Sequence, residues 1–107
     1  MAARPAPTAI VCGNDVLAFG ALLEARRLGI EVPRVLSILG FDDLELARHV
    51  QPALSTMRVP AEAMWRLAAE RLVGALRGDT VPRRTEVEVE LVVRESTARA
   101  PRLRRAG

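Results

Sequence analysis

Short apolar runs and a segment of helical periodicity alternate along the first half of the chain. Residues 9–12 form an apolar run that ends in the turn formers Gly13, Asn14 and Asp15, and residues 35–41 form a second apolar run. Runs of this length bounded by turn residues are typical of buried strands. Between them lies "DVLAFGALLEARRLGI", whose apolar positions fit one face of a helix. A strand, a helix and a strand with short connections predict a βαβ unit with parallel strands and a right-handed crossover.

Local signals mark both ends of this first helix. Asn14 or Asp15 is expected to accept hydrogen bonds from the free amides of the first turn. Arg26 and Arg27 suit the negative end of the helix dipole, and Gly29 supplies the left-handed position that often follows a helix. The apolar positions of this helix are Val16, Phe19, Leu22, Leu23 and Ala25.

A second helix is predicted over residues 60–77. Pro60 stands near its first position, Glu62 lies in its first turn, and Gly78 follows its end. An apolar stripe runs along the helix, and such a stripe is much more often core than a cofactor site. The stripe consists of Met64, Leu67, Ala68, Leu72, Ala75 and Leu76.

The remaining segments predict shorter elements. Residues 44–50 allow one or two helical turns, which Pro52 ends, and residues 53–59 form a short strand or extended crossing. Residues 85–96 alternate valine and leucine with glutamate, which predicts a strand with one side facing water.

Two adjacent acids, Asp42 and Asp43, follow the second predicted strand directly. Asn14 and Asp15 follow the first strand, so all four residues lie at the carboxyl edge of the predicted sheet, where open parallel sheets bind ligands. The acids could form a catalytic pair, cap the next helical turn or bind a ligand. Asp42 with Glu45 resembles a capping box, and Asp43 alone could also cap this turn. A ligand site would combine the carboxylate of Asp42 with the amide of Asn14, a pairing that suits hydroxyl or amine groups.

The catalytic reading has little support. Successive side chains leave a strand on opposite faces, so Asp42 and Asp43 should diverge and not face one substrate. His49 is the single histidine, and Cys12 in an apolar strand is expected to be an inert buried thiol. No metal-binding spacing, phosphate-binding glycine loop or nucleophile elbow occurs. We therefore expect no enzyme activity, no metal and no cofactor.

Composition sets the size and the compartment. The 107 residues suffice for one domain, and a lone cysteine excludes an internal disulfide and fits a reducing, cytoplasmic setting. No apolar stretch approaches the roughly 18 residues that a membrane helix needs, and no signal segment opens the chain. The 16 basic residues are all arginine with a net charge of only +3, so a basic nucleic-acid surface is not indicated. The arginine-rich residues 98–107 are expected to form a disordered tail.

Four stretches together resemble the lactose-repressor-type (LacI/GalR) transcription regulators. They are "PTAIVCGND", "ALLEARRLGIEVPRVLSILGFDDLELARHVQPALSTMRVP", "AEAMWRLAAERLV" and "LVVREST". Their order and spacing match the C-terminal part of the effector domain over about residues 7–97. The resemblance implies an α/β fold of the periplasmic-binding-protein type (type I), with two lobes and the effector between them. This chain would supply a βαβ unit, a further helix and a crossing strand.

The resemblance also implies roles for individual residues. Asn14 and Asp42, the first acid after "GF", would contact a sugar or another small polar effector, and Asp43 would be the cap or a supporting group. "STMRVP" and "EVELVVRES" would cross between the lobes, and residues 60–77 would belong to the N-terminal lobe. Residues near a homodimer partner would be Phe19, Leu23, Leu46, His49 and Val50, with burial in the core as the alternative for the apolar ones.

One residue pair departs from the family pattern. Relatives commonly have Met-Gly where this chain has Met64 and Trp65, and we expect Trp65 to fill a local gap. The helix-turn-helix and the first half of both lobes are absent from the sequence, so operator DNA would be bound only through a part of the parent that is not present. We expect a truncated regulator, with a fragment of a periplasmic solute-binding protein as the alternative.

Residues 1–7 would be a lead-in and residues 8–97 the C-terminal half of the effector-binding and dimerisation domain. Such a half leaves a sheet edge and apolar faces uncovered. The isolated chain is therefore expected to be marginally stable or to aggregate, and to bind its effector weakly or not at all.

Overall fold

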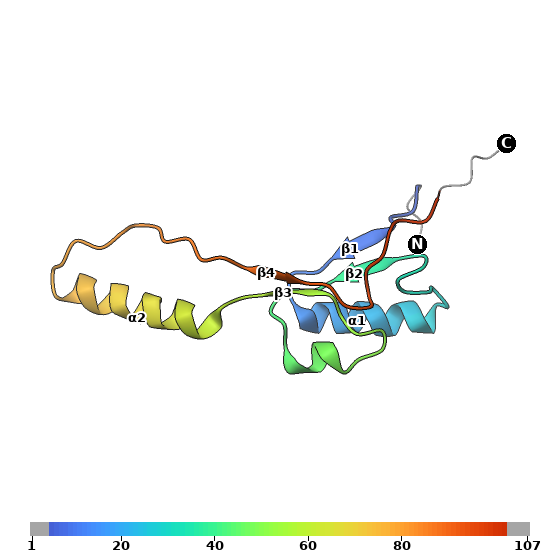
Figure 1. Ribbon diagram of the computed structural model, residues 1–107, viewed down its shortest axis with the longest axis horizontal. Coiled ribbons are helices and arrows are strands. Elements are labelled where there is room, and N and C mark those ends of the chain that lie inside the picture. The colour runs from blue at the N-terminus through green and yellow to red at the C-terminus, as the bar shows by residue number, and fades with distance from the viewer. Residues whose placement is uncertain (1–4, 103–107) are drawn as a thin grey trace. The chain divides into compact units, whose positions relative to one another are not determined.

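The computed structural model describes residues 5–102, which divide into two compact units (Figure 1). Unit 1 comprises the described residues up to Arg58 and those from Leu91 onward, and unit 2 is Val59–Glu90. Residues 103–107 of the predicted tail lie outside the described part of the chain. Unit 1 contains the residues expected to bind a ligand, and unit 2 contains the second helix.

Unit 1 is built on the predicted βαβ unit. Strand β1 (Ala9–Val11), helix α1 (Asp15–Arg27) and strand β2 (Ser37–Leu39) follow in order, and the two strands are parallel. The register pairs Ala9 with Ser37, Ile10 with Ile38 and Val11 with Leu39. A parallel bridge between Leu39 and Ser55 continues the pairing toward the next strand. The predicted βαβ unit with parallel strands is confirmed in this part of the chain.

Helix α1 begins and ends where its sequence signals indicated. The Asn14 side-chain oxygen accepts a hydrogen bond from the Leu17 amide at 2.8 Å, so Asn14 and not Asp15 is the N-cap. At the other end Gly29 has a φ of +72°, and the Ile30 amide donates to the Ala25 carbonyl at 2.8 Å. This geometry is the Schellman motif, in which a left-handed residue lets the chain satisfy the last carbonyls of the helix.

The core of unit 1 lies between α1, β2 and the segment before β3 (Thr56–Arg58). The 3-10 helix η1 (Glu45–Arg48) adds one residue to it and is a single short turn, the lower limit of what the sequence predicted. Burying these aliphatic side chains is the main favourable contribution to the folding of unit 1. The core cluster consists of Ala18, Leu22, Leu36, Ile38, Ala47 and Leu54.

The "REST" segment closes unit 1 through hydroxyl groups. Ser96 is fully buried, and its hydroxyl donates to the Ile38 carbonyl at 2.6 Å and accepts from the Ser55 amide at 2.8 Å. The Ile38 amide donates to the Ser96 carbonyl at 2.9 Å, and the Ala98 amide donates to the Ser37 hydroxyl at 3.0 Å. These bonds satisfy backbone groups that would otherwise be buried without partners.

The strand predicted over residues 85–96 forms over only three residues. Strand β4 is Glu90–Val92 and pairs with β3 (Thr56–Arg58), whereas residues 79–89 have no regular secondary structure. Alternation shows which side chains would share a face, but a strand also needs a hydrogen-bonded neighbour along its length. The prediction was therefore correct in the middle of the segment and wrong for the residues on both sides of it.

Unit 2 contains helix α2 (Ala61–Leu76), with Pro60 one position earlier than expected, at the N-cap. The predicted apolar stripe is present, but none of the residues of α2 is buried. Met64 and Leu67 are half-buried and line a shallow groove with residues 82–87. Trp65 is 74% exposed, so the expectation that it fills a local gap is wrong within the described part of the chain.

Candidate functional site

The turn after β2 carries both aspartates in the left-handed region of backbone space. Asp42 has a φ of +122° and Asp43 a φ of +56°. Positive φ is uncommon for residues other than glycine, although aspartate tolerates it better than most. The Asp42 amide donates to the Met57 carbonyl at 2.9 Å, and the Asp43 amide donates to the Thr56 hydroxyl at 3.3 Å. The turn is thus held against β3 and does not continue β2.

Asp15 supports this turn from the N-terminus of α1. Its side chain is fully buried, and its two oxygens accept from the Thr56 hydroxyl at 2.6 Å and from the Leu44 amide at 2.7 Å. Gly40 makes room for this carboxylate, because a Cβ there would lie 2.2 Å from Asp15 Oδ1. The amide at the start of η1 is therefore bound by Asp15, and neither Asp42 nor Asp43 caps the turn. The predicted capping box of Asp42 and Glu45 is wrong.

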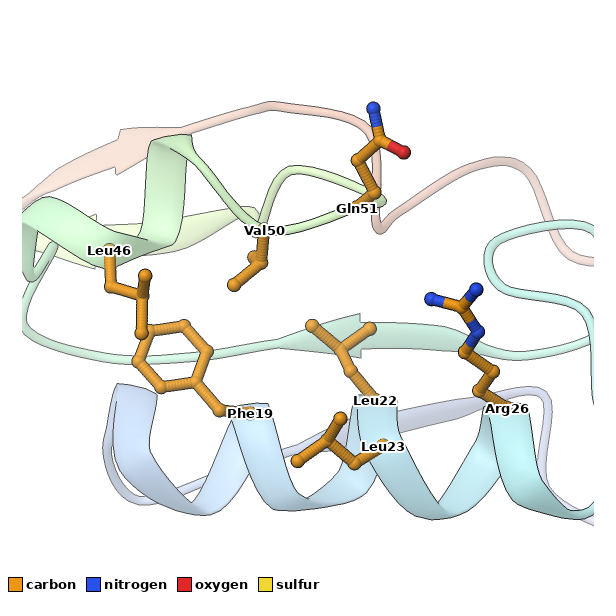
Figure 2. Close-up of a pocket in the computed structure, with 7 residues that line it drawn as sticks. All are labelled: Phe19, Leu22, Leu23, Arg26, Leu46, Val50 and Gln51. Carbon is orange, nitrogen blue, oxygen red and sulfur yellow. The ribbon is translucent and has the colours of Figure 1, made fainter.

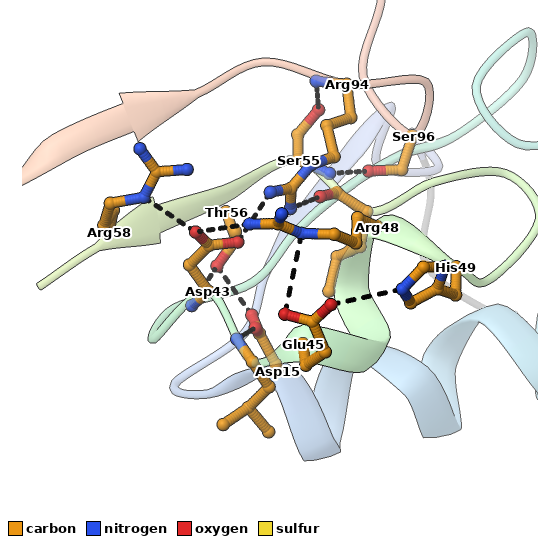
Figure 3. Close-up of polar contacts among 12 residues, drawn as sticks. Asp15, Asp43, Glu45, Arg48, His49, Ser55, Thr56, Arg58, Arg94 and Ser96 are labelled. Atoms are coloured by element: carbon orange, nitrogen blue, oxygen red, sulfur yellow. Dashed lines mark hydrogen bonds and ion pairs between the residues drawn. The ribbon is translucent and has the colours of Figure 1, made fainter.

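Asp43 forms the centre of a cluster of arginines (Figure 3). Its side chain is 5% exposed, and its oxygens accept from Arg94 Nη2 at 2.7 Å and from Arg58 Nε at 2.8 Å. Arg48 approaches to 4.0 Å, and Arg94 also donates to the Leu54 carbonyl at 2.9 Å. Burial raises the pKa of the Asp43 carboxyl, but the hydrogen bonds and charges of Arg58 and Arg94 outweigh burial and hold the pKa below its ordinary value. Asp43 is thus a buried ion-pair partner.

Asn14 and Asp42 lie in neighbouring loops at the carboxyl edge of the β1–β2 pair. The Asp15 amide donates to the Phe41 carbonyl at 2.9 Å, and this bond joins the two loops that carry Asn14 and Asp42. The Asp42 side chain is exposed, and its carboxylate has no hydrogen-bond partner within residues 5–102. The Asn14 oxygen caps α1, which leaves its amide nitrogen as a donor. This edge thus offers one ionised acceptor and one neutral donor.

Four of the five residues predicted near a dimer partner line one apolar groove (Figure 2). The groove has a volume of about 310 Å³ and lies between α1 and the segment around η1. Leu23 is 70% and Leu46 53% exposed, so neither is a core residue of unit 1. His49 does not line the groove but is exposed and contacts Glu45 at 3.3 Å. The groove is lined by Phe19, Leu22, Leu23, Arg26, Leu46, Val50 and Gln51.

Other candidates are placed away from any reactive cluster. Cys12 is half-buried, and burial raises the pKa of its thiol, so the nucleophilic thiolate is disfavoured at neutral pH. In residues 5–102 no helix has both the length and the apolar character needed to cross a bilayer.

The sequence interpretation missed the roles of Thr56, Arg58 and Arg94, which lie in "STMRVP" and "LVVREST". One sequence signal could have pointed to the two arginines. Each ends an apolar segment that comes after Asp42 and Asp43: Arg58 follows "ALSTM" and Arg94 follows "ELVV".

The fold agrees with comparisons to known proteins. The profile of the periplasmic binding protein-like domain family matches residues 1–97. The chain belongs to this family, in the form found in the effector domains of LacI-type transcription regulators.

Particular relatives are transcription regulators. The chain is 44% identical over 95 residues to the HTH-type transcriptional regulator MalR of Streptomyces coelicolor, covering 88% of this chain and 28% of that protein. It is also similar to the transcriptional regulator CelR in complex with cellobiose, with 34% identity and a TM-score of 0.78 over 86% of this chain and 28% of that one. A dimeric Lac repressor gives 30% identity and a TM-score of 0.78 over 90% and 35% of the two chains. The chain thus spans about a third or less of the length of these relatives.

Proposed function

We propose that this chain is the effector-sensing and dimerisation part of a LacI-type transcription regulator whose ligand is a sugar or a similar small polar metabolite. The observation that carries the proposal is the exposed carboxylate of Asp42 on a loop that is hydrogen-bonded to the loop of Asn14, at the carboxyl edge of a parallel strand pair in a chain of this family. Similarity to a regulator bound to cellobiose supports a hydroxyl-bearing ligand.

Ligand recognition follows from the hydrogen-bonding capacity of the two side chains. The Asp42 carboxylate accepts hydrogen bonds from two hydroxyl groups, and charge-assisted bonds of this kind are stronger than neutral ones. The Asn14 amide nitrogen donates to a hydroxyl or ring oxygen while its carbonyl oxygen stays on the Leu17 amide. The N-cap bond therefore also fixes the direction in which Asn14 presents its donor.

The apolar groove between α1 and the η1 segment supports the dimerisation half of the proposal. Leu23 and Leu46 expose large aliphatic surface beside the half-buried Phe19 and Val50, and such a patch is typical of a protein interface. The dimeric Lac repressor has a similar fold over the matched residues. In the whole regulator, ligand binding would shift an equilibrium between two arrangements and so change operator affinity, with DNA bound by a part outside this chain.

A cytoplasmic regulator accounts for the observations better than an enzyme or a solute-binding protein. Asp43 is neutralised by arginines, so it is unsuited to act with Asp42 on a substrate. Relatives that match most of this chain, such as MalR and the Yersinia enterocolitica repressor PurR, are HTH-type transcriptional regulators by name.

The test uses a hybrid in which residues 8–97 replace the matching stretch of Streptomyces coelicolor MalR. A panel of monosaccharides and disaccharides that includes cellobiose is screened by calorimetry. We expect at least one sugar to bind and Asp42→Asn to weaken its binding by about tenfold or more, corresponding to the ~1.5–3 kcal/mol of a hydrogen bond to a charged group. Asp79→Asn, an exposed acid in unit 2, is the matched control and should leave affinity unchanged.

Asn14→Ser separates the two roles of Asn14. Serine caps helices about as well as asparagine, so the free energy of unfolding should change by no more than about a few tenths of a kcal/mol. Binding should still weaken, because serine lacks the amide nitrogen. Unchanged affinity in both Asp42→Asn and Asn14→Ser would refute the assignment of this edge.

A further inference from the structure

Asp43 connects three segments of unit 1 that are far apart in sequence. Arg58 is the last residue of β3, where the chain leaves unit 1, and Arg94 follows β4, where the chain returns. Both side chains bind Asp43, over sequence separations of 15 and 51 residues. The side chain of Asp43 is almost fully buried, and that of Arg94 is 13% exposed. Arg58 is 45% exposed, so the Arg94–Asp43 pair is the better shielded of the two. Removing one partner of a buried pair is strongly destabilising, because it leaves a buried charge uncompensated.

The turn that carries Asp42 is held in a conformation that needs support. Residues held in such conformations cost roughly 1–3 kcal/mol each and persist only where the surrounding structure over-determines them. The amides of Asp42, Asp43 and Leu44 all have partners from outside the turn: the Met57 carbonyl, the Thr56 hydroxyl and the Asp15 carboxylate. These bonds hold the backbone of the turn, and the arginines hold its one buried side chain.

We propose that Asp43 is a positioning residue for the ligand. Its ion pairs with Arg58 and Arg94 keep the Asp42–Asp43 turn in the left-handed conformation that presents the Asp42 carboxylate at the sheet edge. Asp43 does not contact the ligand, because its oxygens are occupied by arginines and turned away from solvent. This inference rests on the proposed ligand-binding role of Asp42.

A mechanical consequence follows from where the two arginines lie. They stand next to the points at which the chain passes into unit 2 and returns from it. A shift of either strand end would move Arg58 or Arg94, which bind Asp43, and would thereby displace the turn. Conversely, a ligand that displaces Asp42 would displace these strand ends. The proposal thus links ligand affinity to the geometry of these two strand ends through one carboxylate.

Asp43→Asn is the sharpest probe, because asparagine keeps the shape of the side chain and tolerates left-handed backbone. The substitution removes the negative charge and replaces one of the two oxygens that accept from Arg58 and Arg94 with an NH2 group, which cannot accept. Hydrogen exchange of the 107-residue chain is measured by NMR. We expect the amides of residues 42–44 to exchange about tenfold faster or more, as for local opening of a turn that has lost hydrogen bonds to a charge. The Ile38 and Leu54 amides, bonded elsewhere in unit 1, should change by less than about twofold. Glu24→Gln, which removes the exposed pair with Arg27, is the control and should leave residues 42–44 unchanged.

A purely structural role predicts a different pattern. If Asp43 only stabilised unit 1, all slowly exchanging amides would accelerate together, and that result would overturn the proposal. Unchanged exchange at residues 42–44 would overturn it as well. If circular dichroism shows that Asp43→Asn does not fold, the same exchange measurement is made on Arg94→Lys. This variant keeps a positive charge near Asp43 but removes the planar guanidinium group. Faster exchange confined to residues 42–44 again supports the proposal.

The ligand readout uses the MalR hybrid. Asp43→Asn should lower sugar affinity by about tenfold, and the Asp42→Asn/Asp43→Asn double variant should bind no more weakly than Asp42→Asn alone. Additive losses would mean that Asp43 acts independently of Asp42 and would refute the positioning role. If the hybrid binds no sugar, the proposed function fails, while the exchange measurement still decides whether Asp43 holds the turn.

Discussion

Units 1 and 2 are built from similar apolar residues but differ in how much of them is buried. Unit 1 buries Ile38 and Leu54 completely and surrounds them with satisfied polar groups. In unit 2, α2 has an apolar stripe of the right period, yet Leu72 is 62% and Leu76 78% exposed. The comparison shows that periodicity identifies the face of a helix that is suited to burial. Whether that face is covered depends on what else the chain provides.

The difference lies in the sequence separation of the contacts. In unit 1, β2 is covered by the segment around Ser96, which returns from 58 residues away. In unit 2 the groove beside α2 is lined only by the helix itself and by residues 82–87, which follow it directly. Local packing alone buries little area, so α2 gains less stabilisation per apolar residue than α1.

A matched pair of leucine truncations should give the largest contrast between the units. Leu54→Ala removes a fully buried side chain and leaves a cavity, and should lower the free energy of unfolding by about 2–5 kcal/mol. Leu76→Ala makes the same chemical change at an exposed position and should alter stability by no more than about 0.5 kcal/mol. Urea unfolding followed by circular dichroism measures both. Equal losses in the two variants would show that α2 is buried in solution.

Glycine substitutions should give a smaller contrast within unit 1. A Cβ at residue 40 would overlap Asp15 Oδ1 and lie 2.9 Å from Leu54 Cδ2, so Gly40→Ala should destabilise by about 1–3 kcal/mol or more. A Cβ at residue 20 would have no neighbour within 4 Å, so Gly20→Ala should stabilise α1 by about 0.5–1 kcal/mol. Thermal melts of the two variants should shift in opposite directions. A Gly40→Ala variant as stable as the parent would contradict the packing of Asp15 against Gly40.

The pH dependence of stability should give the smallest effect. The folded-state pKa of Asp43 lies below its ordinary value, which is about 3.9 in unfolded chains, so its ionised form stabilises the fold above that pH. This stabilisation is lost as the pH falls from about 4 through the folded-state pKa. Its charged neighbours are Arg58 on β3, Arg94 after β4 and Arg48 on η1, all positive throughout this range.

Urea unfolding at a series of pH values between about 5 and 2 tests this expectation. Between about pH 4 and 2 the stability of the parent chain should fall more steeply than that of Asp43→Asn, by at most about 1.4 kcal/mol per pH unit. Glu62→Gln in unit 2 is the control, because its pair with Arg66 is exposed, and it should keep the steeper slope. Identical slopes in the parent and Asp43→Asn would show that Asp43 is not held by the arginines in solution.

Sequence patterns predicted the parts of the fold that depend on neighbouring residues. The start of α1 at the Asn14–Asp15 pair, its end before Gly29 and the parallel pairing of the first two strands are confirmed. Each depends on groups within one turn of helix or on a short connection, so the chemistry is visible in the sequence. The family resemblance then identified the fold as a whole.

Features that depend on distant residues were not predictable in the same way. Asp43 was expected to be a cap or a supporting group, and the cap is wrong because its partners are Arg58 and Arg94, which no local pattern links to it. Asp15 was considered only as a helix cap, although it binds Leu44 and Thr56 across unit 1. The strand over residues 85–96 was overextended because its pairing partner β3 has only three residues. The ligand-binding and dimer roles of the candidate residues stay predictions.

The hydroxyl bonds of Ser96 also bear on how the protein is made. The ribosome synthesises Ile38 well before Ser96, so β2 emerges while the segment that covers it is still untranslated. Until then the nascent chain carries an apolar parallel pair whose polar backbone groups lack their final partners, a state that is prone to misassociation. Folding of unit 1 must therefore wait for nearly the last codons of the stretch it spans, and translation that stops short of Ser96 would release a polypeptide that cannot complete its first-made strands.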